Sequence, residues 1–177
     1  MIVISNHIKT HRILPIPDDV IIRINMAWIK TEKELIKIIE GIRQDIFLDF
    51  PQGRTKPPTP ILSLEIALKM MRKYKHITHF AISNAESIKI IAHLRSIIPS
   101  HIELVPKIET PIGVDLLTKI IKTAKTKTIM CDKEDLYLNV NRDNDKFNKY
   151  VEKTRKICKK LKVTALELQG VIFSGGN

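Results

Sequence analysis

A lysine and a glutamate stand two residues apart at the end of an apolar segment, in the run Val105-Pro106-Lys107-Ile108-Glu109. Alternate residues of a β-strand point to the same side, so a strand here would present the Lys107 ammonium and the Glu109 carboxylate together. In α/β proteins the catalytic groups gather at the carboxyl ends of strands. The pair is therefore the first candidate for chemistry, and a structural salt bridge at a strand end is the alternative.

Six short apolar runs predict the strands that would position such groups. They recur at intervals of roughly 25 to 35 residues, the length of a strand-plus-helix unit. The runs are Val20–Met26, Asp45–Phe50, Ile77–Ser83, Ile102–Glu109, Thr128–Asp132 and Val163–Leu168. Helical periodicity fills the gaps. The predicted helices begin at the capping box of Thr31 and Glu34, at Asn84, at Gly113 and at Asn144.

Strands that alternate with helices predict a parallel sheet, and the sequence contains neither a Gly-x-Gly-x-x-Gly motif nor a Walker phosphate loop. Polar residues end four different strands, as they do at the mouth of a (β/α)₈ TIM-type barrel. These residues are Arg23, Asn25, Asp49, Lys107, Glu109, Asp132 and Asp135. We therefore expect one barrel domain over residues 1–177. A complete barrel takes about 250 residues, so this one must be small and incomplete or have reduced helices, most of all near the N-terminus.

The composition excludes several classes of protein. No apolar run reaches the ~18 residues of a membrane span, and the N-terminus lacks the features of a signal peptide, so we expect a cytoplasmic protein without membrane contact. The net charge is +11, but the lysines are spread along the predicted helices and aromatic residues make up only 5%. Nucleic-acid binding is therefore a weaker hypothesis than solvated basic helix faces.

Four segments, in order and with matching spacing from about residue 20 to residue 140, resemble the pyruvate kinases. Arg23–Met26 is similar to that family's Arg-x-Asn-Phe-Ser-His strand, and Phe47–Lys56 to its Leu-Asp-x-x-Gly-Pro-x-x-Arg strand and loop. Lys107–Val114 is close to its Lys-Ile-Glu-x-x-x-Gly strand, and Met130–Leu136 resembles its Ala-Arg-Gly-Asp-Leu strand end. The wider group is the phosphoenolpyruvate/pyruvate barrels, which include the citrate-lyase-type and 2-keto-acid aldolases.

The resemblance implies a metal-dependent site. The family residues that match Glu109 and Asp135 hold a divalent cation, and two carboxylates with substrate oxygens suit Mg²⁺ or Mn²⁺. Asp132 is the alternative ligand if the alignment shifts. The lysine that matches Lys107 stabilises the charge of an enolate or a phosphoryl group, and the arginine that matches Arg23 holds phosphate.

Other matched positions depart from the family. Asn25 and Asp49 match two potassium ligands, but Ala27 and Phe50 stand where the family has serine and threonine. Half of the monovalent-ion site is thus missing, which argues against bound K⁺. The pyruvate kinases also have a threonine on their seventh strand, and Thr164 is a loose candidate for the matching residue.

The Pro-rich loop also departs from the family. Arg54 and Lys56 precede residues Pro57–Pro60 and could bind an anionic substrate, although a rigid connector is an equal alternative. The family's lid domain would lie between Lys56 and Ile61 and is absent, as is its C-terminal regulatory domain. Without a lid, lyase or aldolase chemistry fits better than phosphoryl transfer, because a phosphoryl-transfer site must exclude water.

Two functions remain open. The first is a pyruvate kinase-like, Mg²⁺- or Mn²⁺-dependent enzyme that acts on phosphoenolpyruvate, pyruvate or a related 2-oxo acid through an enolate. The second is a catalytically degenerate barrel that serves as a binding or assembly subunit, since Glu134 and Tyr137 replace glycines of the family motif. An incomplete barrel leaves strand edges open, so we also expect a homo-oligomer.

Overall fold

The computed structural model describes residues 2–5, 16–53, 58, 61–169 and 172–175. Its eight strands pair in chain order into a closed ring. Neighbouring strands are parallel from the first to the seventh, and the eighth is antiparallel to both of its neighbours. The strands are β1 (Ile2–Ser5), β2 (Ile21–Asn25), β3 (Asp45–Phe50), β4 (Ile77–Ile82), β5 (Glu103–Ile108), β6 (Thr128–Cys131), β7 (Thr164–Gln169) and β8 (Ile172–Gly175).

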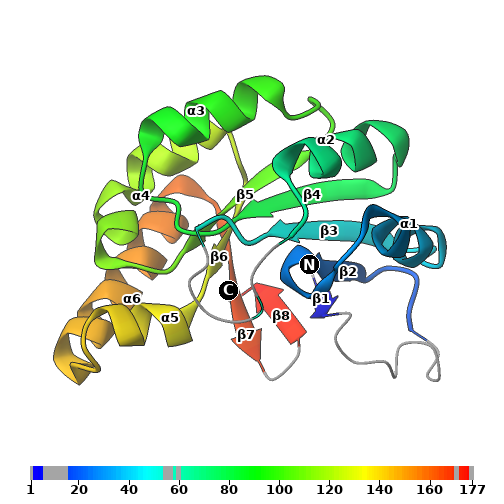
Figure 1. Ribbon diagram of the computed structural model, residues 1–177. Helices are drawn as coiled ribbons and strands as arrows, with labels where there is room; N and C mark the ends of the chain where they lie inside the picture. The colour runs from blue at the N-terminus through cyan, green and yellow to red at the C-terminus, as the bar shows by residue number, and fades with distance from the viewer. Residues whose placement is uncertain (1, 6–15, 54–57, 59–60, 170–171, 176–177) are drawn as a thin grey trace.

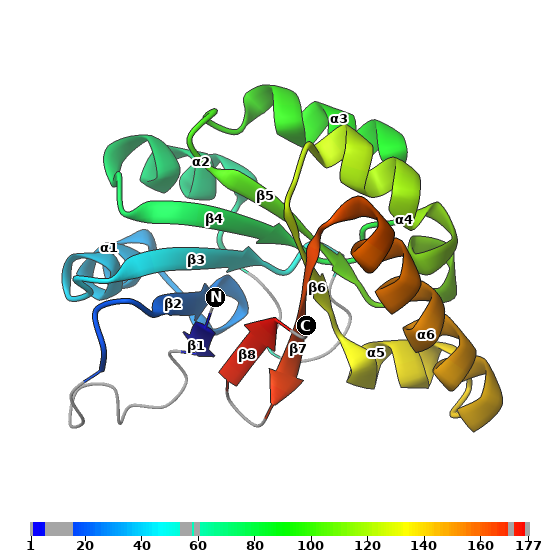
Figure 2. The same ribbon diagram turned by 180° about the vertical axis from the view of Figure 1, so that it is seen from behind.

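The helices follow the strands and form a layer over one side of the curled sheet (Figures 1 and 2). They are η2 (Met26–Trp28), α1 (Glu32–Glu40), α2 (Leu64–Lys73), α3 (Ile88–Ile97), α4 (Pro111–Ala124), α5 (Lys133–Asn139) and α6 (Asn144–Leu161). In the part of the chain that the structure describes, no helix follows β7, because β7 and β8 form a hairpin. None of the described helices has the length and apolar character that a membrane crossing requires.

The prediction of an α/β fold with a curled parallel sheet is confirmed, and so are all six predicted strands, to within one or two residues at their ends. The predicted barrel was of the (β/α)₈ type, small and incomplete or with reduced helices, and the structure departs from the eightfold parallel pattern because β8 runs antiparallel. The sequence analysis also missed β1. The closed ring removes the open strand edge on which the expectation of a homo-oligomer was based, and that expectation stays a prediction.

Side-chain caps fix where the helices begin. Thr31 accepts the Glu34 N–H at 3.1 Å, as the capping box predicts. Asn84 does not cap α3, contrary to prediction, since that helix begins at Ile88 and its N-cap is Ser87, three residues after Asn84. Asn84 instead adopts a left-handed conformation with φ +52°. In this conformation its backbone N–H points toward the carboxylate of Glu109, which directly follows β5.

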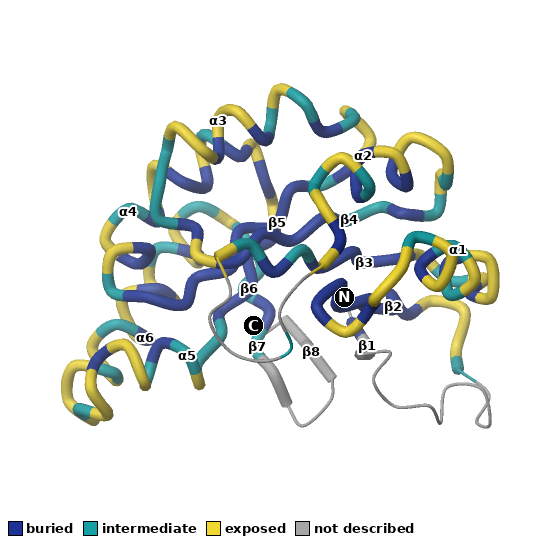
Figure 3. Tube along the Cα trace, in the orientation of Figure 1, coloured by how far each residue is buried: buried dark blue, intermediate teal, exposed yellow. Residues whose placement is uncertain are grey.

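The apolar core has two parts, and Figure 3 shows the buried residues along the chain in dark blue. The larger part lies between the sheet and the helices and includes Leu35, Met70 and Leu117. The smaller part fills the inside of the ring with one residue from each of seven strands. These residues are Val3, Ile21, Phe47, Ala81, Val105, Met130 and Leu166. The inside of the ring is therefore packed at this level, and the residues that follow it along the strands lie above this layer.

Candidate active site

The polar site lies directly above the apolar layer, because a strand presents every second residue to the same side. Each polar residue follows an apolar inward-facing residue by two positions. The steps are Ile21 to Arg23, Phe47 to Asp49, Ala81 to Ser83 and Val105 to Lys107. All four polar residues are buried. Because side chains alternate along a strand, the residues two positions after the apolar layer form a second layer above it, and three of these four residues are charged.

Buried charges of alternating sign run across three strands. The Arg23 guanidinium on β2 donates to the Asp49 carboxylate on β3, with Nε 2.9 Å from Oδ2. The Lys107 ammonium on β5 lies 3.8 Å from the same oxygen and 2.9 Å from Glu109 Oε1. Lys107 also donates to Ser83 Oγ at 3.2 Å. The predicted pairing of Lys107 with Glu109 is therefore present.

Burial acts on both members of this pair. It would by itself lower the pKa of Lys107, but the carboxylates of Asp49 and Glu109 outweigh it, so the Lys107 pKa lies above its usual value. Burial raises the pKa of Glu109, and Lys107 and the Asn84 N–H only partly offset this effect. An ammonium that stays charged in a desolvated pocket is a strong stabiliser of developing negative charge.

The second oxygen of Glu109 is held by the backbone of the neighbouring strand's loop. Asn84 N–H donates to Glu109 Oε2 at 2.7 Å, which its left-handed conformation allows. Its side-chain amide donates to the Gln52 carbonyl at 3.2 Å and ties the loop after β3 to the loop after β4. Both Glu109 oxygens are thus oriented, and each keeps lone pairs for a further ligand.

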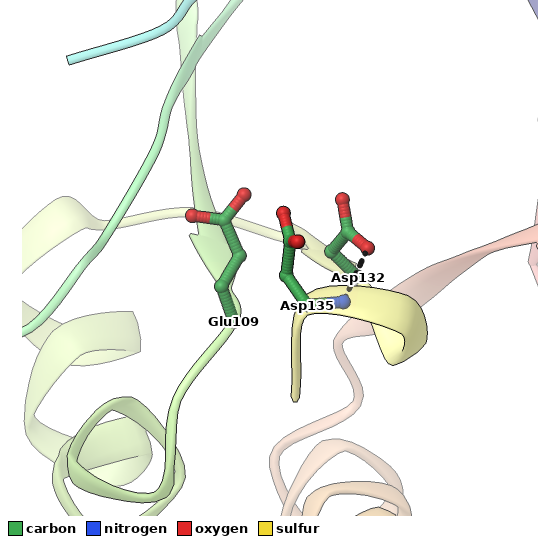
Figure 4. A group of neighbouring side chains, drawn as sticks. All are labelled: Glu109, Asp132 and Asp135. Atoms are coloured by element: carbon green, nitrogen blue, oxygen red, sulfur yellow. Dashed lines mark hydrogen bonds between the residues drawn. The ribbon is translucent and has the colours of Figure 1, made fainter. Parts of the chain in front are cut away.

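Three carboxylates converge beside this pair (Figure 4). Glu109, Asp132 and Asp135 each offer one oxygen, and these oxygens all lie within 4.8 Å of one another. Asp132 caps α5 by accepting the Asp135 N–H at 3.2 Å. Asp132, not Asp135, is therefore the helix cap, and the first turn of α5 brings Asp135 toward Glu109.

The cluster fits a small divalent cation. Around six-coordinate Mg²⁺, adjacent oxygens lie about 2.9 Å apart and opposite ones about 4.2 Å, so three carboxylate oxygens within 4.8 Å of one another must move closer together to bind one cation. With Arg23, Asp49 and Lys107, the three carboxylates make a group of two cations and four anions, which leaves two net negative charges for a cation to balance. Oxygen-only donors favour Mg²⁺ or Mn²⁺ over softer metals.

A cavity of about 280 Å³ opens onto these groups. Its lining includes six of the residues that the sequence analysis selected: Arg23, Asn25, Lys107, Glu109, Asp132 and Asp135. Asp49 does not line it, because Arg23 and Lys107 cover this fully buried residue. Asn25 lines the cavity while its Oδ1 accepts the Ala27 N–H and caps η2.

Besides Asp49, one selected residue lies away from the cavity, and two lie outside the part of the chain that the structure describes. Thr164 is the first residue of β7, at the end of the strand away from the mouth, beside Thr128. Arg54 and Lys56 lie outside the described residues. The potassium role of Asp49 and the anion role of the two basic residues stay predictions.

Sequence reasoning missed three polar residues that line the cavity, namely Ser83, Asn84 and Asn139. The first two directly follow β4, so the rule that selected polar residues at the other strand ends would have found them. Asn139 carries no such signal, since it ends a short helix and reaches the site only through the packing of α5.

Comparison with known proteins shows the fold but no family. No family model matches the sequence, and no curated protein matches it. Among solved structures, the chain resembles the citrate synthase SbnG with 13% identity and a TM-score of 0.62, covering 86% of this chain and 69% of that one. It also resembles an HpcH/HpaI aldolase/citrate lyase family protein from Burkholderia cenocepacia J2315, with 10% identity, a TM-score of 0.63 and coverage of 85% and 71%.

A third neighbour is the citrate lyase beta subunit from M. tuberculosis complexed with oxaloacetate and magnesium. Its identity is 13% and its TM-score 0.54, with 83% of this chain and 67% of that one covered. At these identities the likeness shows a shared barrel-type fold. The resemblance to pyruvate kinase rests on the sequence motifs.

Proposed function

We propose that this protein is a divalent-metal-dependent enzyme that acts on pyruvate, phosphoenolpyruvate or a related 2-oxo acid through an enolate. The observation that carries the proposal is the shared cavity in which the buried Lys107 ammonium lies 2.9 Å from Glu109, while Glu109 faces Asp132 and Asp135. Known proteins of similar fold include one that was solved with oxaloacetate, a 2-oxo acid, and magnesium.

In this proposal Glu109, Asp132 and Asp135 hold Mg²⁺ or Mn²⁺. The bound cation would supply Lewis-acid polarisation of the carboxylate and 2-oxo oxygens of the substrate. Asn84 and Lys107 keep the Glu109 carboxylate aimed into the cavity through its two oxygens. The fixed orientation means that little reorganisation is needed when the substrate arrives.

Lys107 and Arg23 are the charge-stabilising residues of the proposal. The Lys107 ammonium is held by Ser83, Asp49 and Glu109, and its raised pKa keeps it protonated. It can therefore stabilise an enolate oxygen as negative charge develops there. Arg23 lines the same cavity and is oriented by Asp49, so it can bind the substrate carboxylate or a phosphate.

We favour a lyase- or aldolase-type step over phosphoryl transfer. The segment between Lys56 and Ile61 is too short for the lid domain that the pyruvate kinases carry there. Cleavage or formation of a carbon–carbon bond next to an enolate tolerates water better than phosphoryl transfer does. In this proposal, the resemblance to the pyruvate kinase motifs reflects a similar enolate-binding site and not the use of a phosphoryl donor.

The test combines ligand binding with an enolate readout. Mn²⁺ at a hundredfold excess over its Kd should stabilise the fold by about 2.7 kcal/mol, and oxalate, an enolate mimic, should raise the melting temperature further. The exchange of pyruvate methyl protons with D₂O, followed by NMR, reports enolate formation directly. Glu109→Gln should abolish the Mn²⁺ effect and the exchange, and Glu152→Gln, on the exposed surface of α6, should change neither.

An unchanged melting shift in Glu109→Gln would remove the metal assignment. Binding of Mn²⁺ and oxalate by the wild-type protein without proton exchange would instead support the alternative of a degenerate barrel that binds its ligand without turning it over.

A further inference from the structure

We propose that Asn139 is a positioning residue that sets the spacing between the carboxylates of Glu109 and Asp135. This inference rests on the metal-dependent function proposed above. Asn139 lines the cavity and is the last residue of α5. Nothing in its sequence neighbourhood marks it out, and it becomes informative only through its hydrogen bonds.

The side-chain amide of Asn139 bridges the two segments that carry the carboxylates. Its Nδ2 donates to the backbone carbonyl of Glu109 at 3.1 Å and to that of Asp135 at 2.9 Å. An amide nitrogen has two hydrogens, so Nδ2 can donate to both carbonyls. The two acceptors belong to the residues whose side chains face each other in the carboxylate cluster.

A second tie joins the same two segments at the other end of the helix. Asp132 N–H donates to the Ile108 carbonyl at 3.1 Å. One bond at the start of α5 and one at its last residue together restrain both the sliding and the rotation of this helix against β5. Because α5 has only seven residues, its position depends on such ties more than on its own stability.

The restraint should matter most for ions with strict geometry. Mg²⁺ and Mn²⁺ require near-octahedral oxygens at short distances, and Ca²⁺ accepts longer and less regular ones. Hydrogen-bond partners that orient metal ligands typically contribute 10- to 100-fold to affinity. Loss of the Asn139 bridge should therefore weaken Mn²⁺ binding more than Ca²⁺ binding.

The experiment measures both ions on the full chain by titration calorimetry. Asn139→Leu keeps the approximate size of the side chain and removes both donors, and Asn139→Ala serves if the leucine variant does not fold. The control is Asn148→Leu, the same change at an exposed position on α6. We expect Asn139→Leu to weaken Mn²⁺ binding at least about tenfold and Ca²⁺ binding less than about threefold, while Asn148→Leu binds both ions as the wild-type protein does.

The outcomes are distinguishable. If the wild-type protein binds Mn²⁺ and Asn139→Leu binds it equally well, the positioning role is wrong and the proposed function stands. Equal losses for both ions, together with a lower melting temperature in EDTA, would show a merely structural role and overturn the inference. A wild-type protein that binds no Mn²⁺ would overturn both proposals.

Discussion

Two adjacent layers inside the barrel are built by the same strands and have opposite chemistry. The lower layer is wholly apolar and centres on Phe47 and Val105. The upper layer, two residues further along β2, β3 and β5, holds Arg23, Asp49 and Lys107 in a buried chain of ion pairs. Burying the lower layer stabilises the fold at roughly 25 cal/mol per Å² of apolar surface. Buried ion pairs contribute little net stability, because desolvation offsets their attraction.

The difference bears on the proposed function. A chain under pressure only to fold would gain by continuing the apolar layer upward, since replacing a buried ion pair with apolar side chains is often neutral or stabilising. The charged layer instead faces the cavity that Lys107 and Glu109 line. Stability in the lower layer and chemistry in the upper layer should therefore respond differently to mutation.

The largest effect is expected in the apolar layer. Phe47→Ala removes a fully buried ring that stacks on His79 with centroids 5.8 Å apart. The cavity and the lost transfer free energy should lower the free energy of unfolding by about 4 kcal/mol, measured by urea denaturation. Phe47→Leu should lose much less. Mn²⁺ affinity of the folded variant should stay unchanged, and a loss of affinity would show that the two layers are not separable.

A smaller loss of stability is expected in the charged layer, and a second substitution should recover most of it. Asp49→Leu leaves the Arg23 and Lys107 charges without this carboxylate, so the free energy of unfolding should fall by about 3 kcal/mol. The double variant Arg23→Met/Asp49→Leu should regain most of this loss, because the cation goes together with its partner. A double-mutant cycle in urea measures the coupling. Simply additive losses would contradict the buried ion-pair interpretation.

The smallest effect is a pH dependence at the edge of the apolar layer. Burial lowers the pKa of His79 below its usual value of 6.5, although Glu103, with Oε2 3.7 Å from His79 Nε2, and Asp45 act in the opposite direction. The folded state therefore disfavours the protonated ring, and the unfolded chain takes up the proton first. Stability from this group is complete above pH 6.5 and falls as the pH drops through the window below it.

The measurement compares unfolding free energies at pH 7.5 and 5.5 for the wild-type protein and His79→Phe. One group contributes at most about 1.4 kcal/mol per pH unit. His79→Phe should lose less stability than the wild-type protein on acidification. An identical loss in both proteins would assign the pH dependence to other groups.

Much of the architecture could be predicted because its signals are local. Short apolar runs that recur along the chain predicted β2 to β7, and the capping box at Thr31 predicted the start of α1. The missed elements lack such signals. β1 and β8 have four residues each, and both are held by long-range pairing with each other. The antiparallel closure depends on a hairpin after β7, where a complete (β/α)₈ barrel has a crossover helix.

The residues of the candidate site likewise divide into those with a local sequence signal and those without one. Lys107 and Glu109 could be selected because their spacing of two residues puts them on one side of a strand. Asn84 was assigned to the wrong role. Asparagine is favoured both as a helix N-cap and in the left-handed conformation, and Asn84, with φ +52°, adopts the second. Asn139 escaped notice because its amide bonds to carbonyls that are four and 30 residues away in the chain.

The sequence by itself determined the alternation of strands and helices and the residues that each strand turns inward, because both follow from periodicities of two and about 3.6 residues. It also determined which strand ends are charged. Only the tertiary structure decided that Asp49 is covered while Asp132 and Asp135 meet Glu109, and that an asparagine bridges two of these carboxylate-bearing segments. Those relations depend on strand register, on the closure of the ring and on the docking of α5, all of which arise from contacts between residues far apart in the chain.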